Sequence, residues 1–211
     1  YFAKELRKVL GCPVAILNGS RGGTRIEAWM SEGALMPFEG QFDPRKPKTG
    51  EEKANWNTAS ALWNGIVAPI VPYAMRGAIW YQGEANAGNA DLYRRTFPAM
   101  IADWRKAWGQ GDFPFLFVQL APFMKIVTEP QESAWAELRD AQLHASNIVP
   151  NTAIAIITDA GDPEDIHPKR KKPVGDRLAL AARVLAYGED LAYKGPSFKS
   201  MTVVGSRVVM D

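Results

Sequence analysis

The stretch Gly77-Ala78-Ile79-Trp80-Tyr81-Gln82-Gly83-Glu84-Ala85-Asn86 decides the fold of this chain. Its first half is an apolar run between two glycines, too short for a free-standing helix, and this predicts a buried β-strand. Its second half changes to polar and backbone-permissive residues. Open α/β sheets build their sites where a buried strand presents polar groups at its carboxyl end, before a helix. Taken alone, the segment is equally consistent with a strand that ends in a solvated turn.

Other apolar runs alternate with amphipathic helical patterns along the chain. The runs predict further strands at residues 14–17, 115–120 and 153–157, and the helical patterns cover residues 1–10, 93–108, 134–145 and 173–185. This alternation is typical of an α/β fold with a mostly parallel sheet that is covered by helices on both faces. Pro98 lies inside one helical pattern, so we expect a kink there or the first turn of a second segment.

The pattern changes near the C-terminal end of the sequence. We predict one α/β domain over residues 1–190, followed at 191–211 by the start of a β-rich segment with two short β-like pieces, 201–204 and 207–210. The chain opens at Tyr1 directly on a helical pattern. We therefore expect it to lack its natural start.

The composition excludes several classes of protein. With 211 residues, 46% of them hydrophobic, the chain can bury one substantial core. The net charge is only +2. The basic cluster 169–172 is too short to indicate a nucleic-acid partner and is better explained as the solvent-exposed start of a helix. Proline or charge interrupts every apolar stretch, so no membrane span is predicted. The single cysteine, Cys12, excludes an internal disulfide and a cysteine-rich metal site.

Three predicted strands end in polar loops, after Leu17, Tyr81 and Ile157. In a parallel sheet these ends lie on one rim, so the loops should converge there. The first of them is the glycine loop, residues 18–24, in which Gly22 and Gly23 offer backbone N–H groups suited to an oxyanion. It lacks both the Walker and the dinucleotide-binding spacing, so it is no phosphate loop. The Gln82 side chain can donate one more hydrogen bond to the same point.

The chain holds two histidines in different contexts. His144 lies within a predicted helix and is most simply a half-buried or surface residue. His167 follows a strand end in a loop with three acidic residues, and acids beside an imidazole favour its action as a general base. A surface histidine in an acidic loop is the alternative interpretation. No metal site is predicted, because no second imidazole lies at ligand spacing.

Three blocks of sequence resemble the sialate O-acetylesterase family of the SGNH hydrolase superfamily. They are Asn18-Gly19-Ser20-Arg21-Gly22-Gly23-Thr24-Arg25-Ile26-Glu27-Ala28-Trp29, Ile79-Trp80-Tyr81-Gln82-Gly83-Glu84-Ala85-Asn86, and Asp165-Ile166-His167-Pro168 with Val174-Gly175-Asp176-Arg177-Leu178-Ala179 behind it. The resemblance runs from residue 1 to about 187. It implies a three-layer α/β/α fold of the flavodoxin-like type and a serine esterase, without a cofactor, that removes O-acetyl groups from sialic acid or other sugars. It also suggests a secreted, periplasmic or lysosomal protein, whereas the residues themselves leave the compartment open.

The resemblance assigns roles to residues of the third block. His167 corresponds to the general base. Asp165 matches the Asp-Ile-His pattern of the family and is the favoured orienting acid, although the wider superfamily places its acid three residues before the histidine, which is Glu164 here. By the same comparison Gly22, Gly23 and Gln82 form part of the oxyanion hole, and Glu84 and Asn86 bind substrate or support the site.

Two departures from the family pattern matter. The residue after Glu84 is commonly serine in the family and is Ala85 here. The nucleophilic serine of the family lies in a glycine-rich Ser-Asn turn on an earlier strand, so we expect an N-terminal segment, in cis or as a separate chain, to supply it. Ser20 is the only rival inside a glycine turn, and it lacks the nucleophile-elbow pattern because Asn18 replaces the first glycine. A sugar-binding protein that kept the cleft and lost the nucleophile is the alternative function.

Overall fold

The centre of the fold is a parallel three-stranded sheet with the strand order β1-β2-β3. We analysed a computed structural model that describes residues 1–42 and 56–211. The strands are β1 (Ala78–Trp80), β2 (Phe115–Val118) and β3 (Thr152–Ala155). Ala78 pairs with Phe115, and Phe115 pairs with Thr152. The strand predicted from the opening stretch is confirmed, but Ile79 is 40% exposed because no described residue pairs with the outer edge of β1.

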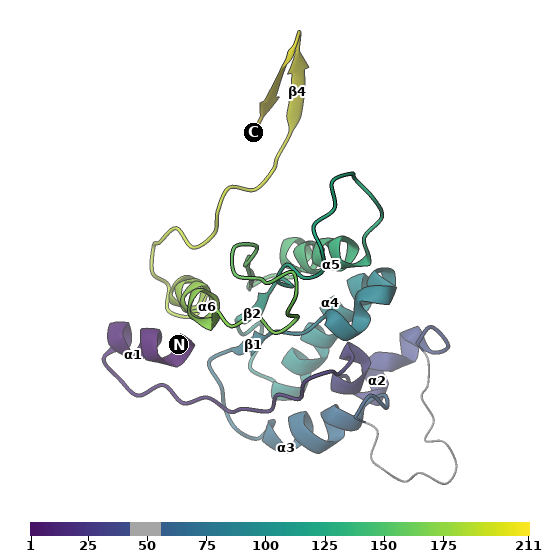
Figure 1. The fold of residues 1–211 in the computed structure, drawn as a ribbon. Helices are drawn as coiled ribbons and strands as arrows, with labels where there is room; N and C mark the ends of the chain where they lie inside the picture. Colours follow the sequence, from purple (N-terminus) through teal and green to yellow (C-terminus); the bar gives the residue numbers. More distant parts are fainter. Residues whose placement is uncertain (43–55) are drawn as a thin grey trace.

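Helices cover both faces of the sheet and form a three-layer α/β/α arrangement (Figure 1). On one face lie α4 (Ala90–Trp108) and α5 (Ala134–Ile148), and on the other α1 (Phe2–Leu10) and α6 (Lys171–Leu185). The side chains of β2 alternate between the two layers, as strand geometry requires. Phe115 and Phe117 enter one core cluster, whereas Leu116 and Val118 enter the other.

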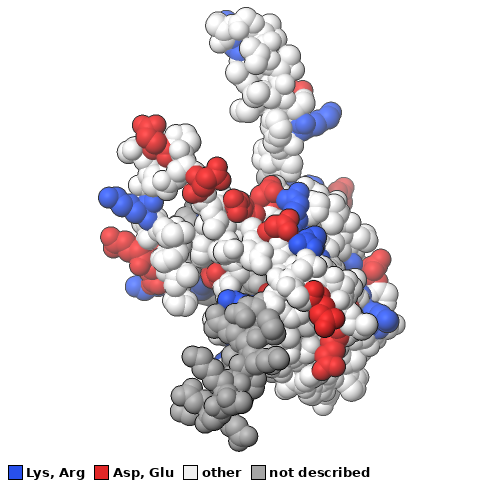
Figure 2. All heavy atoms as spheres, turned by 90° about the vertical axis from the view of Figure 1, so that its right-hand side faces the viewer, with Lys and Arg blue, Asp and Glu red and all other residues white. Residues whose placement is uncertain are grey.

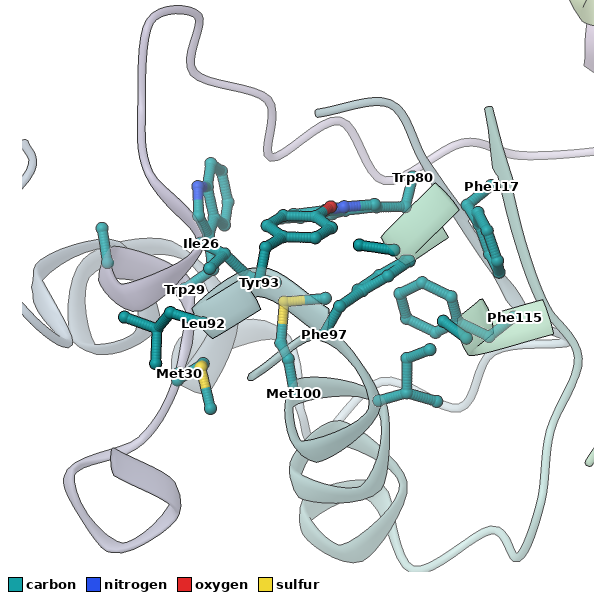
Figure 3. Packing of buried hydrophobic residues seen from close by; sticks show 14 of the residues in the cluster. Ile26, Trp29, Met30, Trp80, Leu92, Tyr93, Phe97, Met100, Phe115 and Phe117 are labelled. Carbon is teal, nitrogen blue, oxygen red and sulfur yellow. The ribbon is translucent and has the colours of Figure 1, made fainter. Parts of the chain in front are cut away.

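The larger core is built on the aromatic stripe of α4 (Figure 3). Tyr93, Phe97 and Met100 are buried there, and the rings of Phe97 and Phe117 lie 4.8 Å apart between centroids. Helix α4 continues through Pro98 to Gly109, whose φ of 62° ends it in the left-handed conformation. The prediction that a second segment begins at Pro98 is therefore wrong.

Short helices connect the larger elements. They are η1 (Ile26–Trp29), α2 (Glu32–Leu35), η2 (Met36–Phe38), η3 (Trp63–Val67), α3 (Ala68–Ile70) and η4 (Glu84–Asn89). The strand predicted at 14–17 is wrong: these residues belong to no sheet, and Ile16 and Leu17 are 50% and 51% exposed. An apolar run becomes a strand only where a neighbour completes its hydrogen bonds, and no described residue does so here.

Residues 191–211 lead away from the three layers (Figure 1). They end in an antiparallel hairpin of β4 (Met201–Val204) and β5 (Arg207–Met210), whose residues are all exposed. The projecting hairpin is mostly uncharged, and on the face shown in Figure 2 acidic and basic side chains are scattered without a patch of one sign. The two β-like pieces are confirmed. Among the described residues no helix is long and apolar enough to cross a membrane.

Candidate active site

A large cavity lies along the unpaired edge of β1. Its volume is about 880 Å³, and its walls come from α1, α6, β1 and the segment 14–22. The side chains of Ile16, Leu17 and Ile79 line it and are all at least 40% exposed. An apolar trough of this size is within the range of ligand sites and is also wide enough for a polypeptide segment. At the carboxyl end of β1 it meets the glycine loop and Gln82.

Hydrogen bonds fix the glycine loop at its end. Gly22 and Gly23 are exposed, and Gly23 has a φ of 70°, which glycine adopts without strain. The Oγ1 of Thr24 donates to the Arg21 carbonyl over 2.8 Å and accepts from Trp29 Nε1 over 3.0 Å. Asn57 Nδ2 donates to the Gly23 carbonyl over 3.2 Å. The loop therefore presents its glycine backbone at the surface while its end is tied into the core.

A buried network joins the loop to the opening stretch. Gln82 Nε2 donates to the Thr24 carbonyl over 2.9 Å and to Asn86 Oδ1 over 2.7 Å. Asn86 Oδ1 also accepts from Ile26 N over 3.0 Å, and its Nδ2 donates to Glu27 Oε2 over 3.1 Å. The structure thus brings Gln82 and Asn86 together at the glycine loop, whereas Glu84 is only half-buried. Both Nε2 hydrogens of Gln82 are occupied, and its Oε1 is buried without a partner among the described residues.

His167 lies at the surface of its loop. Its side chain is 90% exposed, and Nδ1 lies 3.7 Å from Asp165 Oδ1, too far for a hydrogen bond. Asp165 Oδ1 instead accepts from the His167 backbone N–H over 2.8 Å. The Glu164 backbone N–H donates to Asp162 Oδ1 over 2.9 Å. Asp165 is thus nearest to the imidazole, and among the described residues no hydrogen bond or ion pair joins His167 to Gln82 or the glycine loop.

An ion pair anchors the start of this loop to α6. Arg177 donates to both carboxylate oxygens of Asp159, over 2.6 and 2.9 Å, and to the Ile156 carbonyl over 2.8 Å. These hydrogen bonds from Arg177 lower the pKa of Asp159 from its ordinary 3.8 to about 2. Asp159 lies in the segment between Ala155, the last residue of β3, and His167, so the pair holds the start of the histidine loop against α6.

Tyr81 and Lys171 also border the cavity, and the sequence analysis gave neither a role. Lys171 Nζ lies 5.1 Å from the centroid of the Tyr81 ring, within the range of a cation–π contact. Burial, followed by the charge of Glu84, raises the pKa of Tyr81 to about 12, so its hydroxyl stays protonated at neutral pH. The position of Tyr81 directly before Gln82 at a strand end was the available signal.

No serine in the described part of the chain hydrogen-bonds to His167. Ser20 donates through Oγ to Asn18 Oδ1 over 2.7 Å, which closes a local turn. His144, on α5, lies with Nδ1 3.1 Å from Arg94 Nη2, away from the cavity lining. No group of three or more potential metal ligands is found within residues 1–42 and 56–211.

Comparisons with known proteins show the family to which the chain belongs. The chain is 36% identical to sialate O-acetylesterase of Homo sapiens over 215 residues, which cover 92% of this chain and 40% of that protein. It is 31% identical to the Rattus norvegicus enzyme over 257 residues, with 100% of this chain and 46% of that protein covered. A crystal structure of a carbohydrate acetylesterase from Xanthomonas citri has a TM-score of 0.84 and 41% identity, and the match covers 99% of this chain and 45% of that one.

The chain therefore spans less than half the length of these relatives. The α/β fold with a parallel sheet, expected from the sequence pattern, is also that of the solved acetylesterase. A family model described as "Carbohydrate esterase, sialic acid-specific acetylesterase" matches residues 1–183. On this match, and on the identity to the relatives, the chain belongs to the sialic acid-specific acetylesterase family of carbohydrate esterases.

Proposed function

We propose that this chain forms most of a serine-type carbohydrate O-acetylesterase. The observation that carries the proposal is the cavity beside β1, which Gly22 and Gln82 both line, and where Gln82 is hydrogen-bonded to Thr24, the residue after the exposed Gly23. Backbone N–H groups held by a rigid scaffold suit the negative charge that develops when an ester carbonyl is attacked. Family membership supports the same chemistry.

His167 acts as the general base of the proposed reaction. It takes the proton of the serine hydroxyl as the serine oxygen attacks the acetyl carbonyl, and it returns that proton to the sugar oxygen that leaves. A water molecule, activated by His167 in the same way, then releases acetate from the acetyl-serine. Asp165 is the favoured orienting acid, since its Oδ1 lies 3.7 Å from the Nδ1 of the exposed imidazole. Glu164 is the second candidate for that role.

Gly22 and Gly23 supply the backbone donors of the oxyanion hole in this proposal. Gln82 is the candidate side-chain donor. Its Nε2 already donates both hydrogens, so it can donate to the oxyanion only if it gives up one of these bonds. Either the bond to Thr24 or the bond to Asn86 must be exchanged as the tetrahedral intermediate forms. The two glycines need no such exchange. Asn86, which is 5% exposed, supports the site through its buried hydrogen bonds, and the half-buried Glu84 is the proposed contact to the sugar.

The nucleophilic serine comes from a segment that fills the cavity. The outer edge of β1 is unpaired among the described residues, and the segment 14–17 faces it across an apolar trough. A strand that enters here parallel to β1 ends on the same rim as Gln82, because parallel strands share the direction of their carboxyl ends. A serine at the end of such a strand lies beside Gly22 and Gly23. The segment N-terminal to this chain, or a separate chain, is the proposed source.

A serine-directed fluorophosphonate and an aryl acetate substrate test the proposal. The full-length protein should hydrolyse the acetate and become labelled on a serine outside residues 1–211. The 211-residue chain alone should show neither property. Labelling of Ser20 in an active 211-residue chain would overturn the assignment of the glycine loop as oxyanion hole. Binding of acetylated sugars by the full-length protein, with neither hydrolysis nor labelling, would favour the non-catalytic sugar-binding function.

A further inference from the structure

We infer that Gln142 is a positioning residue that fixes the active-site end of β1, an inference that rests on the proposed function. Gln142 lies on α5 and is fully buried, with 0% of its surface exposed. A buried amide that is fully hydrogen-bonded is costly to disturb, because each partner that it leaves is then buried and unsatisfied. The partners of Gln142 are backbone groups of two different strand ends.

One side chain joins the carboxyl ends of β1 and β2. Gln142 Nε2 donates to the carbonyl of Gln82 over 3.0 Å and, more weakly, to that of Val118 over 3.4 Å. Its Oε1 accepts from the backbone N–H of Leu120 over 2.9 Å. Gln82 and Leu120 lie beyond the last paired residues of their strands, so no ladder bond between β1 and β2 holds them in place. Gln142 therefore holds the two strand ends together beyond the last ladder bond, and the Tyr93 hydroxyl, 3.5 Å from the same Gln82 carbonyl, is a second and longer contact to that oxygen.

Close packing at Gly83 also indicates that α5 is pressed against the end of β1, where Gln142 contacts Gln82. Gly83 has a φ of 152°, and a Cβ placed on it would lie 2.7 Å from Leu138 Cδ2 and 3.1 Å from Gln142 Nε2. Only glycine therefore allows α5 to approach the backbone so closely at this point. The chain leaves β1 through a turn that is pressed directly against the Gln142 side chain.

The position of Gln82 in turn sets the position of the glycine loop. Its side chain holds the Thr24 carbonyl, and Asn86, which it also contacts, holds the backbone N–H of Ile26. A shift of the Gln82 backbone therefore moves the end of the loop that carries Gly22 and Gly23. Displacement of an oxyanion donor by about 1 Å can cost about 10²-fold in rate. Gln142 acts through this chain of contacts and need not touch the substrate.

The decisive variant is Gln142→Met in the full-length enzyme, since methionine matches the length of glutamine without its hydrogen bonds. The turnover number, expressed per active site titrated with a fluorophosphonate, should fall about 10- to 100-fold, while KM for an aryl acetate changes less than about twofold. The matched control is Gln119→Met. Gln119 is 8% exposed and donates to the Arg139 carbonyl over 3.2 Å, without contact to Gln82. Its turnover per active site should stay at the wild-type value.

Hydrogen exchange measured by mass spectrometry gives a readout that does not depend on activity. Peptides covering residues 80–86 and 118–121 should exchange faster in Gln142→Met than in the wild type, and the 80–86 peptide should be unchanged in Gln119→Met. Unchanged turnover per active site in folded Gln142→Met, or an equal loss in both variants, overturns the inference. If Gln142→Met does not fold, Gln142→Asn, which is too short to reach both strands, must show the same loss. An inactive wild-type protein refutes the proposed function instead, and hydrogen exchange then decides whether Gln142 holds β1.

Discussion

The side-chain amide of Gln82 joins the carboxyl end of β1 to the glycine loop, because its Nε2 lies 2.9 Å from the carbonyl oxygen of Thr24. The same nitrogen lies 2.7 Å from Asn86 Oδ1. Gln82 therefore has two possible contributions to catalysis: it can place the loop, and it can donate to the oxyanion after one bond is exchanged. Both contributions act on the transition state and neither on ground-state binding of the substrate.

Substitution of Gln82 should accordingly lower turnover and leave KM nearly constant. In the full-length enzyme we expect Gln82→Ala to reduce kcat by about 10²-fold or more, the usual cost of one lost oxyanion donor. Steady-state kinetics with an aryl acetate measure both constants. Gln119→Ala is the control, because Gln119 is equally buried and contacts Arg139 instead of the loop. A change in KM alone would identify Gln82 as a substrate contact and place the oxyanion hole elsewhere.

The two histidines should respond very differently to replacement. His167→Ala should cost several orders of magnitude in acetyl-ester hydrolysis, since members of a catalytic triad act as a unit. His144→Ala removes a part-buried contact between α5 and Arg94 of α4 and should change kcat little. The two variants are compared by kcat/KM at pH 7 to 8, after circular dichroism has shown that both are folded. Equal and mild effects would exclude His167 from the mechanism.

Local sequence patterns correctly predicted the strands that pair with another strand in the described residues. The runs at 78–80 and 115–118 form strands, and a glycine or a proline directly precedes each of them. The run at 14–17 is equally apolar but forms no strand, because apolar character does not report whether a partner completes the hydrogen-bond ladder. Likewise, the acidic residues around His167 were visible in the sequence. Their distances from the imidazole depend on the turn of the loop, which the sequence does not specify.

Gln142 shows what a periodic pattern can and cannot reveal. It lies four residues after Leu138 and three before Ala145, both buried, so its position on the inner face of α5 was open to prediction. Its partners could not be predicted, since they are backbone groups at the ends of two other strands. Polar residues on an inner helix face are best interpreted as holding such groups, because a buried amide without partners is unstable.

Gly83 should tolerate no side chain. Gly83→Ala would place a Cβ 2.7 Å from Leu138 Cδ2 at a φ of 152°. Strain of this kind costs about 1–3 kcal/mol, to which the displacement of Leu138 adds. We expect the free energy of unfolding, measured in urea, to fall by at least about 2 kcal/mol. Gly88→Ala serves as the control, because a Cβ on Gly88 would meet no atom within 4 Å. Equal effects of the two substitutions would show that α5 can move away from β1.

The pair formed by Asp159 and Arg177 should make stability depend on pH in the acid range. Its carboxylate has a pKa of about 2 in the folded chain, below the ordinary 3.8. A depressed carboxyl pKa contributes stability that is present above the ordinary pKa and is lost as pH falls through the folded value. Asp159→Asn should therefore lower the urea midpoint at about pH 5, and the difference from the wild type should shrink progressively toward about pH 2.

The partner residue provides the control for this last effect. In an Arg177→Met background the carboxylate of Asp159 loses both of its hydrogen bonds from the guanidinium, which lie at 2.6 and 2.9 Å. Asp159→Asn should then produce no pH-dependent change in the urea midpoint, so that the double-mutant cycle isolates the pair. A pH-dependent difference that persists without Arg177 would assign the lowered pKa to another group. It would also remove the reason for regarding this pair as the anchor of the histidine loop on α6.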